Sequence, residues 1–413
     1  MQDPDRSLRI LVVSNVYFPD RGGHAVPATE FAEGLAERGH HVDVVTSYPY
    51  YPEWSNKSSA NLWRVAEQEL NGVRVTRYGM YIPSPPANAV ARLLQEGTFL
   101  LSLCRHLLAR RRYDAVVAYC PMLASVVYTT LRASLFGERL WINVQDLPAE
   151  AATGTGLARP GLVWTALGWF QRRLFLRSVT VSAIAPTMVD KVQAYGFPPG
   201  EVQLFPNFLK KSIIETVDEL GDHRSAPELG IRPFRLLYAG NIGRKQNLLE
   251  YCNALASSNL DFEFRVFGAG AEAETLKRRL AGINDPRFVT GPFLSEREFI
   301  SELLSTDLFV VTETPDADAS FVPSKLIPAF ATRTPILAIC DEMGALGQEV
   351  LGNDVGFVSD WSDPQHATLS AMNALSDPVR WVALRSALRE RQGAYSRSDA
   401  LDHATRLVGN LGR

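Results

Sequence analysis

Apolar runs of strand length alternate with helix-like segments along almost the whole chain, and this alternation constrains the fold more than any other feature. The first run, Leu-Arg-Ile-Leu-Val-Val-Ser (8–14), is followed by a loop and by a helical pattern over 25–38. The same reasoning predicts strands at 41–46, 73–77, 115–119, 140–144 and 180–185, and helices at 87–112 and 122–136. Such alternation is typical of a parallel sheet covered by helices on both faces. The sequence therefore predicts an α/β, doubly wound fold.

The alternation is interrupted once and then starts again, which indicates two domains. Segment 196–222 is poor in periodicity and contains three prolines, and we place the domain boundary near 205–230. Further strands are predicted at 234–239, 263–267, 287–290, 308–311, 335–339 and 356–358. A chain of 413 residues also exceeds the size at which a single core stops growing. We expect two Rossmann-like domains facing each other across a cleft, at 1–210 and 211–395, and a last helix within 396–413 that docks on either domain or crosses back to the first.

Residues 234–247 combine a strand, a glycine turn and two cations. The apolar run 234–238 breaks at Gly240 and Gly243, and Arg244 and Lys245 follow before a helical pattern begins. The glycines let backbone N–H groups approach a phosphate, the helix start adds partial positive charge, and the cations neutralise the remaining charge. This order predicts a substrate that carries a diphosphate.

Three other segments admit both a ligand-binding and a purely structural interpretation. Ser-Phe-Val-Pro-Ser-Lys (320–325) opens a helix whose free N–H groups suit an anion, although Ser320 or Ser324 would serve equally as an ordinary cap. The pair Gly22–Gly23 either borders a phosphate or sugar or forms a tight turn. Gly-Ala-Gly (268–270) has the same two interpretations. The first-domain loop is not the GxGxxG of dinucleotide enzymes, which disfavours an oxidoreductase.

Two carboxylates stand where parallel-sheet proteins place their ligands. Asp146 and Glu150 follow the strand at 140–144, and either could accept a proton from a nucleophile or hold a sugar hydroxyl. The alternative is that both are surface acids. The sequence contains no HExxH motif, no CxxC pair and no Ser-His-Asp arrangement, so we expect neither a metal nor hydrolytic chemistry.

Charge and hydropathy limit the partners. A net charge of −3 creates no general attraction to nucleic acid. The polar N-terminus lacks a signal peptide and the apolar stretches are too short to span a bilayer, so a cytoplasmic protein is expected. Segment 164–177 mixes aromatic residues with arginines and either lies on the inner face of the membrane or packs one face on the core. The aromatic loop 48–54 either forms an acceptor pocket or simply packs.

Segments 8–19, 143–146, 205–207, 238–246 and 322–326 together resemble the retaining, nucleotide-sugar-dependent glycosyltransferases of family 4, which have the GT-B fold. Within that family the chain is most similar to the branch of the colanic-acid fucosyltransferase. The resemblance implies that the second domain binds a GDP- or UDP-sugar without a metal. The donor-binding residues it implies are Gly22, Gly23, Asn241, Gly243, Arg244, Lys245, Gly268, Phe293, Leu294, Ser320, Phe321, Val322, Ser324 and Lys325. The acceptor-binding residues are Tyr17, Gln145, Asp146 and Glu150, and the catalytic ones are Asp146, Arg244 and Lys245.

One departure from the family concerns its Glu-x7-Glu pattern. Ser320 and Pro328 occupy the positions of the two acids, so the ribose contact made by the second acid is absent or is supplied from elsewhere. The neighbouring acids Glu313, Asp316 and Asp318 are out of register. Arg333 also replaces a glycine in the turn that follows.

The function expected from these observations is transfer of a sugar from a nucleoside diphosphate, with retention at the anomeric carbon. Arg244 and Lys245 would stabilise the departing diphosphate, a donor phosphate oxygen would receive the acceptor proton, and Asp146 would position the acceptor. The acceptor is either a glycan, including a lipid-linked one, or a small hydroxyl or thiol metabolite of a bacterial natural-product pathway, as in lincomycin-type S-glycosylation. A non-catalytic sugar-nucleotide-binding protein and a phosphosugar epimerase are the alternatives from other classes.

Overall fold

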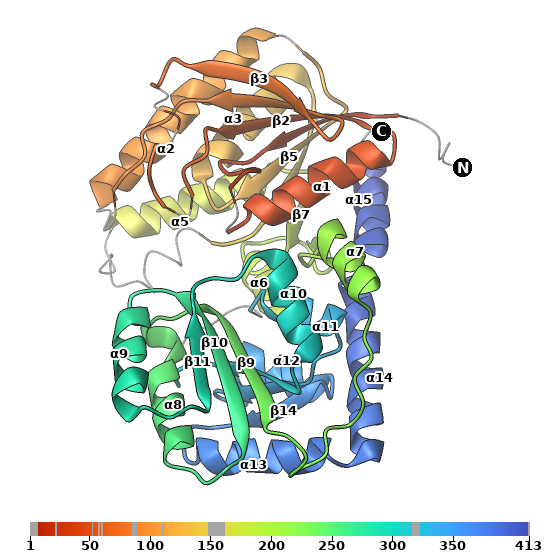
Figure 1. The fold of residues 1–413 in the computed structure, drawn as a ribbon. Helices are drawn as coiled ribbons and strands as arrows, with labels where there is room; N and C mark the ends of the chain where they lie inside the picture. Colours follow the sequence, from red (N-terminus) through yellow and green to blue (C-terminus); the bar gives the residue numbers. More distant parts are fainter. Residues whose placement is uncertain are drawn as a thin grey trace. The chain divides into compact units, whose positions relative to one another are not determined.

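The computed structural model describes residues 7–20, 23–51, 53–56, 58, 61–84, 89–109, 111–147, 162–315 and 323–411. The chain divides into two compact units (Figure 1). Unit 1 comprises Met1–Asn207 together with Ser398–Arg413, and unit 2 comprises Phe208–Arg397. The last helix, α15 (Arg397–Leu411), therefore groups with the first half of the chain rather than with the segment that precedes it.

The sheet of unit 1 has the strand order β3-β4-β2-β1-β5-β6-β7-β8. The bounds are β1 (Arg9–Val13), β2 (His41–Ser47), β3 (Val65–Leu70), β4 (Val73–Tyr78), β5 (Ala115–Cys120), β6 (Arg139–Val144), β7 (Thr180–Ala183) and β8 (Val202–Leu204). Strand β3 pairs antiparallel with β4 through the turn Asn71–Gly72, in which both residues have positive φ. The other described strand pairs of this sheet are parallel.

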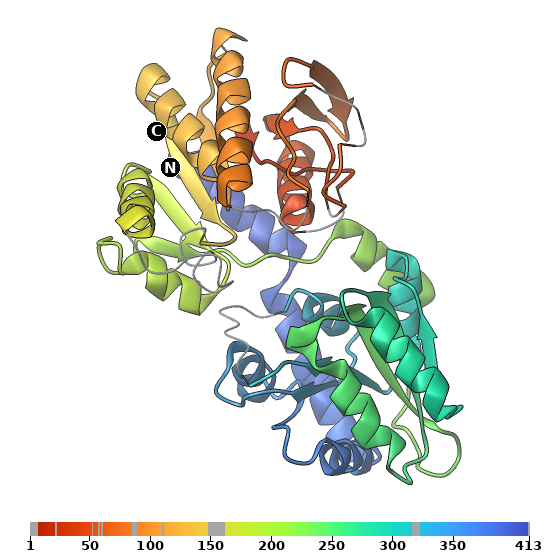
Figure 2. The ribbon, with the colours of Figure 1, turned by 90° about the vertical axis from the view of Figure 1, so that its left-hand side faces the viewer.

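Helices cover both faces of this sheet (Figures 1 and 2). On one face lie α2 (Ala89–Cys104), α3 (Leu123–Phe136), α5 (Leu162–Phe175) and α6 (Pro186–Gln193). On the other face, Phe31 of α1 (Ala25–Glu37) packs edge-on against Trp141 and Phe205. Leu401 of α15 is fully buried against Gly34 of the same helix α1. The core of unit 1 thus has two layers, and the end of the chain completes one of them.

The predicted single helix over 87–112 is wrong beyond Cys104. The chain tightens there into the 3-10 helix η1 (Arg105–Ala109). This change of pitch places His106 in the core, where its Nδ1 lies 2.6 Å from the hydroxyl of Tyr128. The contact between His106 and Tyr128 is a tertiary one, so the local sequence pattern does not show where the α-helix ends.

The sheet of unit 2 has the strand order β11-β10-β9-β12-β13-β14, and its strands are parallel. The bounds are β9 (Phe234–Asn241), β10 (Phe262–Ala269), β11 (Phe288–Gly291), β12 (Leu308–Thr312), β13 (Ile336–Ile339) and β14 (Gly356–Ser359). Its helices are α7 (Lys211–Leu220), α8 (Leu248–Ala256), α9 (Ala273–Ile283), α10 (Glu296–Ser305), α11 (Leu326–Ala331), α12 (Ala345–Gly352), α13 (Pro364–Leu375) and α14 (Pro378–Ala394). The strand order reverses at β9, and ligands of such sheets bind outside the carboxyl ends of the strands at this point.

Segment 196–222, although poor in periodicity, contains β8 and α7. Ile213 of α7 is buried, and Ile214, Val217 and Leu220 pack against the same core. This spacing is helical, but the segment is short and follows prolines, so the pattern is weak in the sequence.

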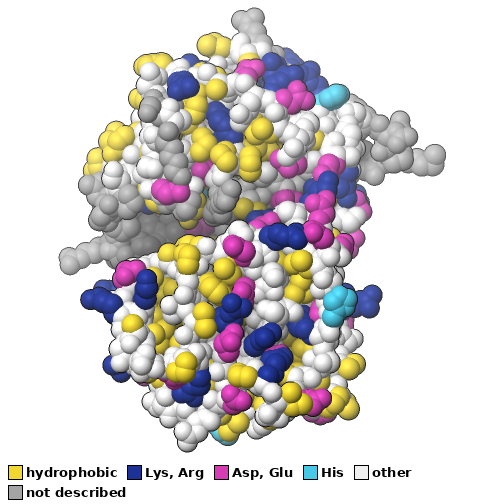
Figure 3. Space-filling model, viewed as in Figure 1, with side chains coloured by type: hydrophobic (Ala, Val, Ile, Leu, Met, Phe, Trp, Pro, Cys, Tyr) yellow, Lys and Arg dark blue, Asp and Glu magenta, His cyan; other side chains and the backbone are white. Residues whose placement is uncertain are grey.

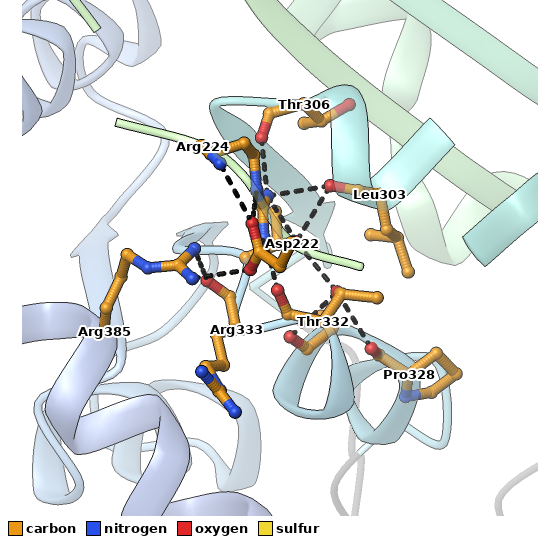
Figure 4. Close-up of polar contacts among 10 residues, drawn as sticks. Asp222, Arg224, Leu303, Thr306, Pro328, Thr332, Arg333 and Arg385 are labelled. Atoms are coloured by element: carbon orange, nitrogen blue, oxygen red, sulfur yellow. Dashed lines mark hydrogen bonds and ion pairs between the residues drawn. The ribbon is translucent and has the colours of Figure 1, made fainter. Parts of the chain in front are cut away.

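A buried polar cluster fixes the chain after α7 (Figure 4). The guanidinium of Arg224 donates hydrogen bonds to the carbonyl oxygens of Leu303, at 2.8 Å, and Thr306, at 2.9 Å. Asp222 accepts hydrogen bonds from Arg224 and from Arg385 of α14. Burial raises the pKa of Asp222, and these two arginines outweigh that effect and hold it at about 2. The cluster anchors the start of unit 2 to α10, to α14 and to the turn after α11.

Candidate functional site

The chain leaves the carboxyl end of β9 through a closed turn that presents two cations. The side-chain oxygen of Gln246 accepts hydrogen bonds from the N–H of Gly243 and from the amide of Asn241, both at 3.1 Å. Arg244 and Lys245 lie between them in the short 3-10 helix η2 (Arg244–Gln246) and are exposed. Within the described part of the chain, neither side chain makes a hydrogen bond or salt bridge. The turn is therefore fixed while its cations remain available to a ligand.

A third cation, Lys325, comes from the segment that precedes α11. Its Nζ lies 4.5 Å from the centre of the Tyr238 ring, and its stem passes Gly240, where an added Cβ would stand 3.8 Å from the Lys325 Cδ. Burial lowers the pKa of Lys325 to about 8, although the nearby Glu313 opposes this shift. A lysine that loses its proton close to neutral pH is poised to respond to an anion.

Glu313 follows β12 and interacts electrostatically with two of these cations. Burial raises the pKa of Glu313, and the charges of Lys325 and Lys245 lower it. The neighbouring Thr314 donates its N–H to the carbonyl oxygen of Lys245 at 2.8 Å, which ties η2 to the end of β12. Lys245 and Lys325 thus both act on one acid, and Arg244 precedes Lys245 in η2, so the group carries a positive charge that suits a polyanion.

Close backbone packing beside these charged residues requires glycine at positions 268 and 270. A Cβ at Gly268 would stand 1.9 Å from the carbonyl oxygen of Gly240, and one at Gly270 would stand 2.4 Å from that of Ile242. Only glycine allows the ends of β9 and β10 to approach so closely. Phe293 is exposed and Leu294 half-buried in the loop after β11, and their contact with a base stays a prediction.

The start of α11 is described only in part. Ser320, Phe321 and Val322, predicted to bind the donor, lie outside the described residues, as do Asp316 and Asp318. Ser324 is exposed, and its carbonyl oxygen accepts the N–H of Ile327 at 3.2 Å.

Pro328 and Arg333, the two departures from the family pattern, belong to α11 and to the turn after it. Pro328 stands in the first turn of this six-residue helix, where a backbone N–H has no helical partner. Arg333 has φ of 52°, the left-handed conformation that favours the glycine of the family pattern.

In unit 1 the predicted acceptor residues lie at the carboxyl ends of β1 and β6, which both pair with β5. Tyr17 is fully buried, and its hydroxyl has no hydrogen-bond partner among the described residues. Gln145 is buried and donates to the side-chain oxygen of Asn143 at 2.8 Å. Asp146 is exposed, and its carboxylate accepts the N–H of Leu147 at 2.8 Å. Asp146 is thus exposed to solvent at this edge, whereas Gly22 and Glu150 lie outside the described residues.

A polar network at the same edge was missed from the sequence. The side chain of Asn15 contacts His24 at 2.9 Å and donates to the hydroxyl of Tyr50 at 2.8 Å. Burial lowers the pKa of His24 to about 4, so this imidazole is neutral at pH 7. Asp20 accepts the N–H groups of Tyr50 and Tyr51, and burial raises its pKa to about 6. No sequence pattern indicated this network, because Asn15, Asp20 and His24 follow β1 whereas Tyr50 and Tyr51 follow β2.

The aromatic loop packs at this edge next to Gly23. Tyr50, Tyr51 and Trp54 contact one another edge-on, and Gly23, with φ of 58°, faces the Tyr51 ring. The guanidinium of Arg92 lies 4.1 Å from the centre of the Trp54 ring. These contacts support packing of the loop, while its role toward an acceptor stays a prediction.

Comparisons with known proteins agree with this architecture. Residues 22–207 match the family described as glycosyl transferase 4-like domain. The chain is 28% identical over 351 residues to WcaI of Escherichia coli K12, a protein named for glycosyl transfer in colanic acid biosynthesis; the match covers 83% of this chain and 85% of that one.

Two solved structures are similar over nearly their full length. The sucrose-phosphate synthase of Thermosynechococcus elongatus superposes with a TM-score of 0.70 at 16% identity, covering 98% of this chain and 99% of that one. Anabaena HepE, solved with UDP and glucose, has a TM-score of 0.64 at 12% identity and covers 98% and 100% of the two chains. The predicted fold class, two parallel-sheet α/β domains, is confirmed. The chain is a glycosyltransferase with the GT-B fold, and its residues 22–207 match the glycosyl transferase 4-like family.

Proposed function

We propose that unit 2 binds the diphosphate of a GDP- or UDP-sugar through Arg244, Lys245 and Lys325. The observation that carries this proposal is the convergence of three cations at the carboxyl end of β9, two of them without a hydrogen bond or salt bridge within the described residues. Anabaena HepE, solved with UDP and glucose, supports a nucleoside diphosphate as the ligand class.

In this proposal the cations stabilise the diphosphate as it leaves the anomeric carbon. Charge that develops on a leaving group is stabilised most by groups that are already in place, and the closed turn at Gln246 holds Arg244 and Lys245 in place. Burial lowers the pKa of Lys325 in the free protein, and an arriving anion would raise it again, because the anion favours the protonated lysine. Three cations would neutralise a diphosphate without a divalent metal, so we propose a metal-independent reaction.

The acceptor side of the proposal concerns the edge of unit 1 that carries Asp146. The exposed carboxylate would hold the acceptor group, and a donor phosphate oxygen would take its proton on the same face of the sugar, giving retention. We propose a glycan hydroxyl as the acceptor, and the similarity to WcaI, which is named for glycosyl transfer in colanic acid biosynthesis, supports this choice. A small hydroxyl or thiol metabolite is the competing outcome of an acceptor screen.

The test measures sugar transfer and donor hydrolysis with UDP- and GDP-sugars in the presence of a chelator. Arg244→Ala and Lys245→Ala should each lower kcat by roughly a hundredfold or more, which is typical for removing a preorganised charge-stabilising group. Lys277→Ala, which removes an exposed cation from α9, is the matched control and should retain activity. Full activity of both site variants would refute the phosphate assignment, and loss of activity with the chelator would refute metal independence.

A further inference from the structure

His24 is a half-buried imidazole at the carboxyl-end edge of the unit 1 sheet, where the exposed Asp146 also stands. It directly follows Gly23, and its carbonyl oxygen accepts the N–H of Ala28 at 3.0 Å, which fixes the residue at the start of α1. Helix α1, like the other described helices, lacks the length and hydropathy required to cross a bilayer. His24 thus has a fixed position at the edge where parallel sheets bind their ligands.

The hydrogen bonds of Asn15 determine which nitrogen of this imidazole carries the proton. Asn15 donates from its amide nitrogen to the hydroxyl of Tyr50 at 2.8 Å, so its amide oxygen is the atom 2.9 Å from His24 Nε2. An amide oxygen only accepts hydrogen bonds, so Nε2 is the donor. Burial lowers the pKa of His24 to about 4, and the imidazole is therefore neutral at pH 7 with a single ring proton. Nδ1 consequently carries a lone pair and no proton.

The rest of the network holds this arrangement in place. Asn15, Tyr50 and Gln95 are only 2 to 4% exposed, and the amide of Gln95 donates to the Tyr50 hydroxyl at 3.4 Å. The N–H of Tyr50 is in turn bound by the carboxylate of Asp20 at 3.1 Å. Within the described residues, Nδ1 of His24 makes no hydrogen bond. The network thus orients an acceptor atom and leaves that atom without a partner, which requires an explanation.

A lone pair on an uncharged ring selects a neutral donor group as its partner. Sugar hydroxyls are such donors, whereas a diphosphate offers only acceptor oxygens to a ring nitrogen that has no proton. Figure 3 shows cationic and acidic side chains mixed on the visible face of unit 1, so no field of one sign favours an ion there. A sugar hydroxyl is therefore the chemical group that Nδ1 fits.

We propose that Nδ1 of His24 binds the sugar substrate by accepting a hydrogen bond from one of its hydroxyl groups that does not react. This inference rests on the proposed function, in which the reacting hydroxyl passes its proton to a donor phosphate oxygen. His24 takes up no proton in that step, and its contact orients the sugar before the transfer. The hydroxyl belongs either to the transferred sugar of the donor or to the acceptor sugar. Asn15, Tyr50 and Gln95 are positioning residues that act through His24.

The first test compares His24→Asn with His24→Gln in assays of sugar transfer and donor hydrolysis with UDP- and GDP-sugars. The asparagine amide reaches the position of Nδ1 and offers its oxygen to the substrate, whereas the glutamine amide reaches the position of Nε2 and keeps the contact with Asn15. His24→Gln should lower kcat/KM roughly tenfold, as expected for one lost hydrogen bond, and His24→Asn should retain most of the activity. The opposite order, or full activity of His24→Gln, would overturn the proposal.

The second test uses Asn15→Asp, which places a carboxylate against Nε2 of His24. The carboxylate should raise the pKa of His24, because it favours the imidazolium, and a protonated Nδ1 cannot accept a hydrogen bond. Transfer by Asn15→Asp should therefore decline as the pH falls through this raised pKa, which ¹⁵N NMR of histidine-labelled protein measures. Asp20, whose pKa is about 6, titrates in both proteins, so the difference between their pH profiles reports on His24. Identical profiles, with His24 protonated in the variant, would overturn the proposal.

Donor hydrolysis identifies the source of the hydroxyl, because water replaces the acceptor. A loss in both assays assigns the hydroxyl to the donor sugar, and a loss in transfer alone assigns it to the acceptor. Calorimetry should show unchanged binding of UDP and GDP in the His24 variants. Activity that is lost in Arg244→Ala but complete in His24→Gln would refute this inference and leave the proposed function intact. His41→Asn, exposed at the amino end of β2, is the matched control and should retain full activity, and thermal unfolding should show that all variants are folded.

Discussion

Raising the pH from about 7.5 to about 9 should weaken the binding of a nucleoside diphosphate about eightfold, because Lys325 loses its proton over this range. With a pKa of about 8, Lys325 is about three quarters protonated at the lower pH and about one tenth protonated at the higher. The direction of this pH effect follows from the shift in the pKa of Lys325: burial lowers this pKa in the free protein, and a bound diphosphate would raise it again. Binding therefore takes up a proton, and affinity falls as the pH passes through 8.

The assay is isothermal titration calorimetry with UDP and GDP across this pH range, in buffers of different ionisation enthalpy that report the proton uptake. Lys325→Arg is the control, because arginine stays protonated and its affinity should not decline. Glu313→Gln should move the decline to lower pH, since the Glu313 charge raises the pKa of Lys325. A flat profile for the unaltered chain, or an equal decline in Lys325→Arg, would refute the placement of Lys325 against the diphosphate.

Three further predictions concern stability. Asp222→Asn should lower the free energy of unfolding by about 2 kcal/mol at neutral pH, and urea denaturation should show this difference disappearing as the pH falls from about 4 to about 2, because the folded-state pKa is depressed. Gly268→Ala should cost about 3 kcal/mol in thermal unfolding because its Cβ meets the Gly240 carbonyl, whereas Gly282→Ala, with open space in α9, should stabilise slightly. Leu401→Ala should cost about 3 kcal/mol in the unfolding of unit 1, and no change there would contradict the docking of α15.

The elements that the sequence predicted well are those whose burial shows in the residues themselves. Parallel strands that are mostly or fully buried, such as β9 and β12, contain apolar runs that the sequence shows. The exposed strand β3 lacks such a run and was not predicted. The end of α2 at Cys104 was not predicted either, because it accompanies a contact between His106 and a residue of α3.

For the candidate site, the sequence by itself determined the local order of glycines and cations at 240–245, because neighbours in the chain must be neighbours in space. Only the tertiary structure decided that Lys325 lies over Tyr238 and near Glu313. These residues are far apart in the sequence, and they meet because β12 pairs beside β9, which brings Glu313 at the end of β12 close to the end of β9. The physical reason is that long-range proximity depends on strand order, whereas hydrophobic periodicity reports only which residues are buried.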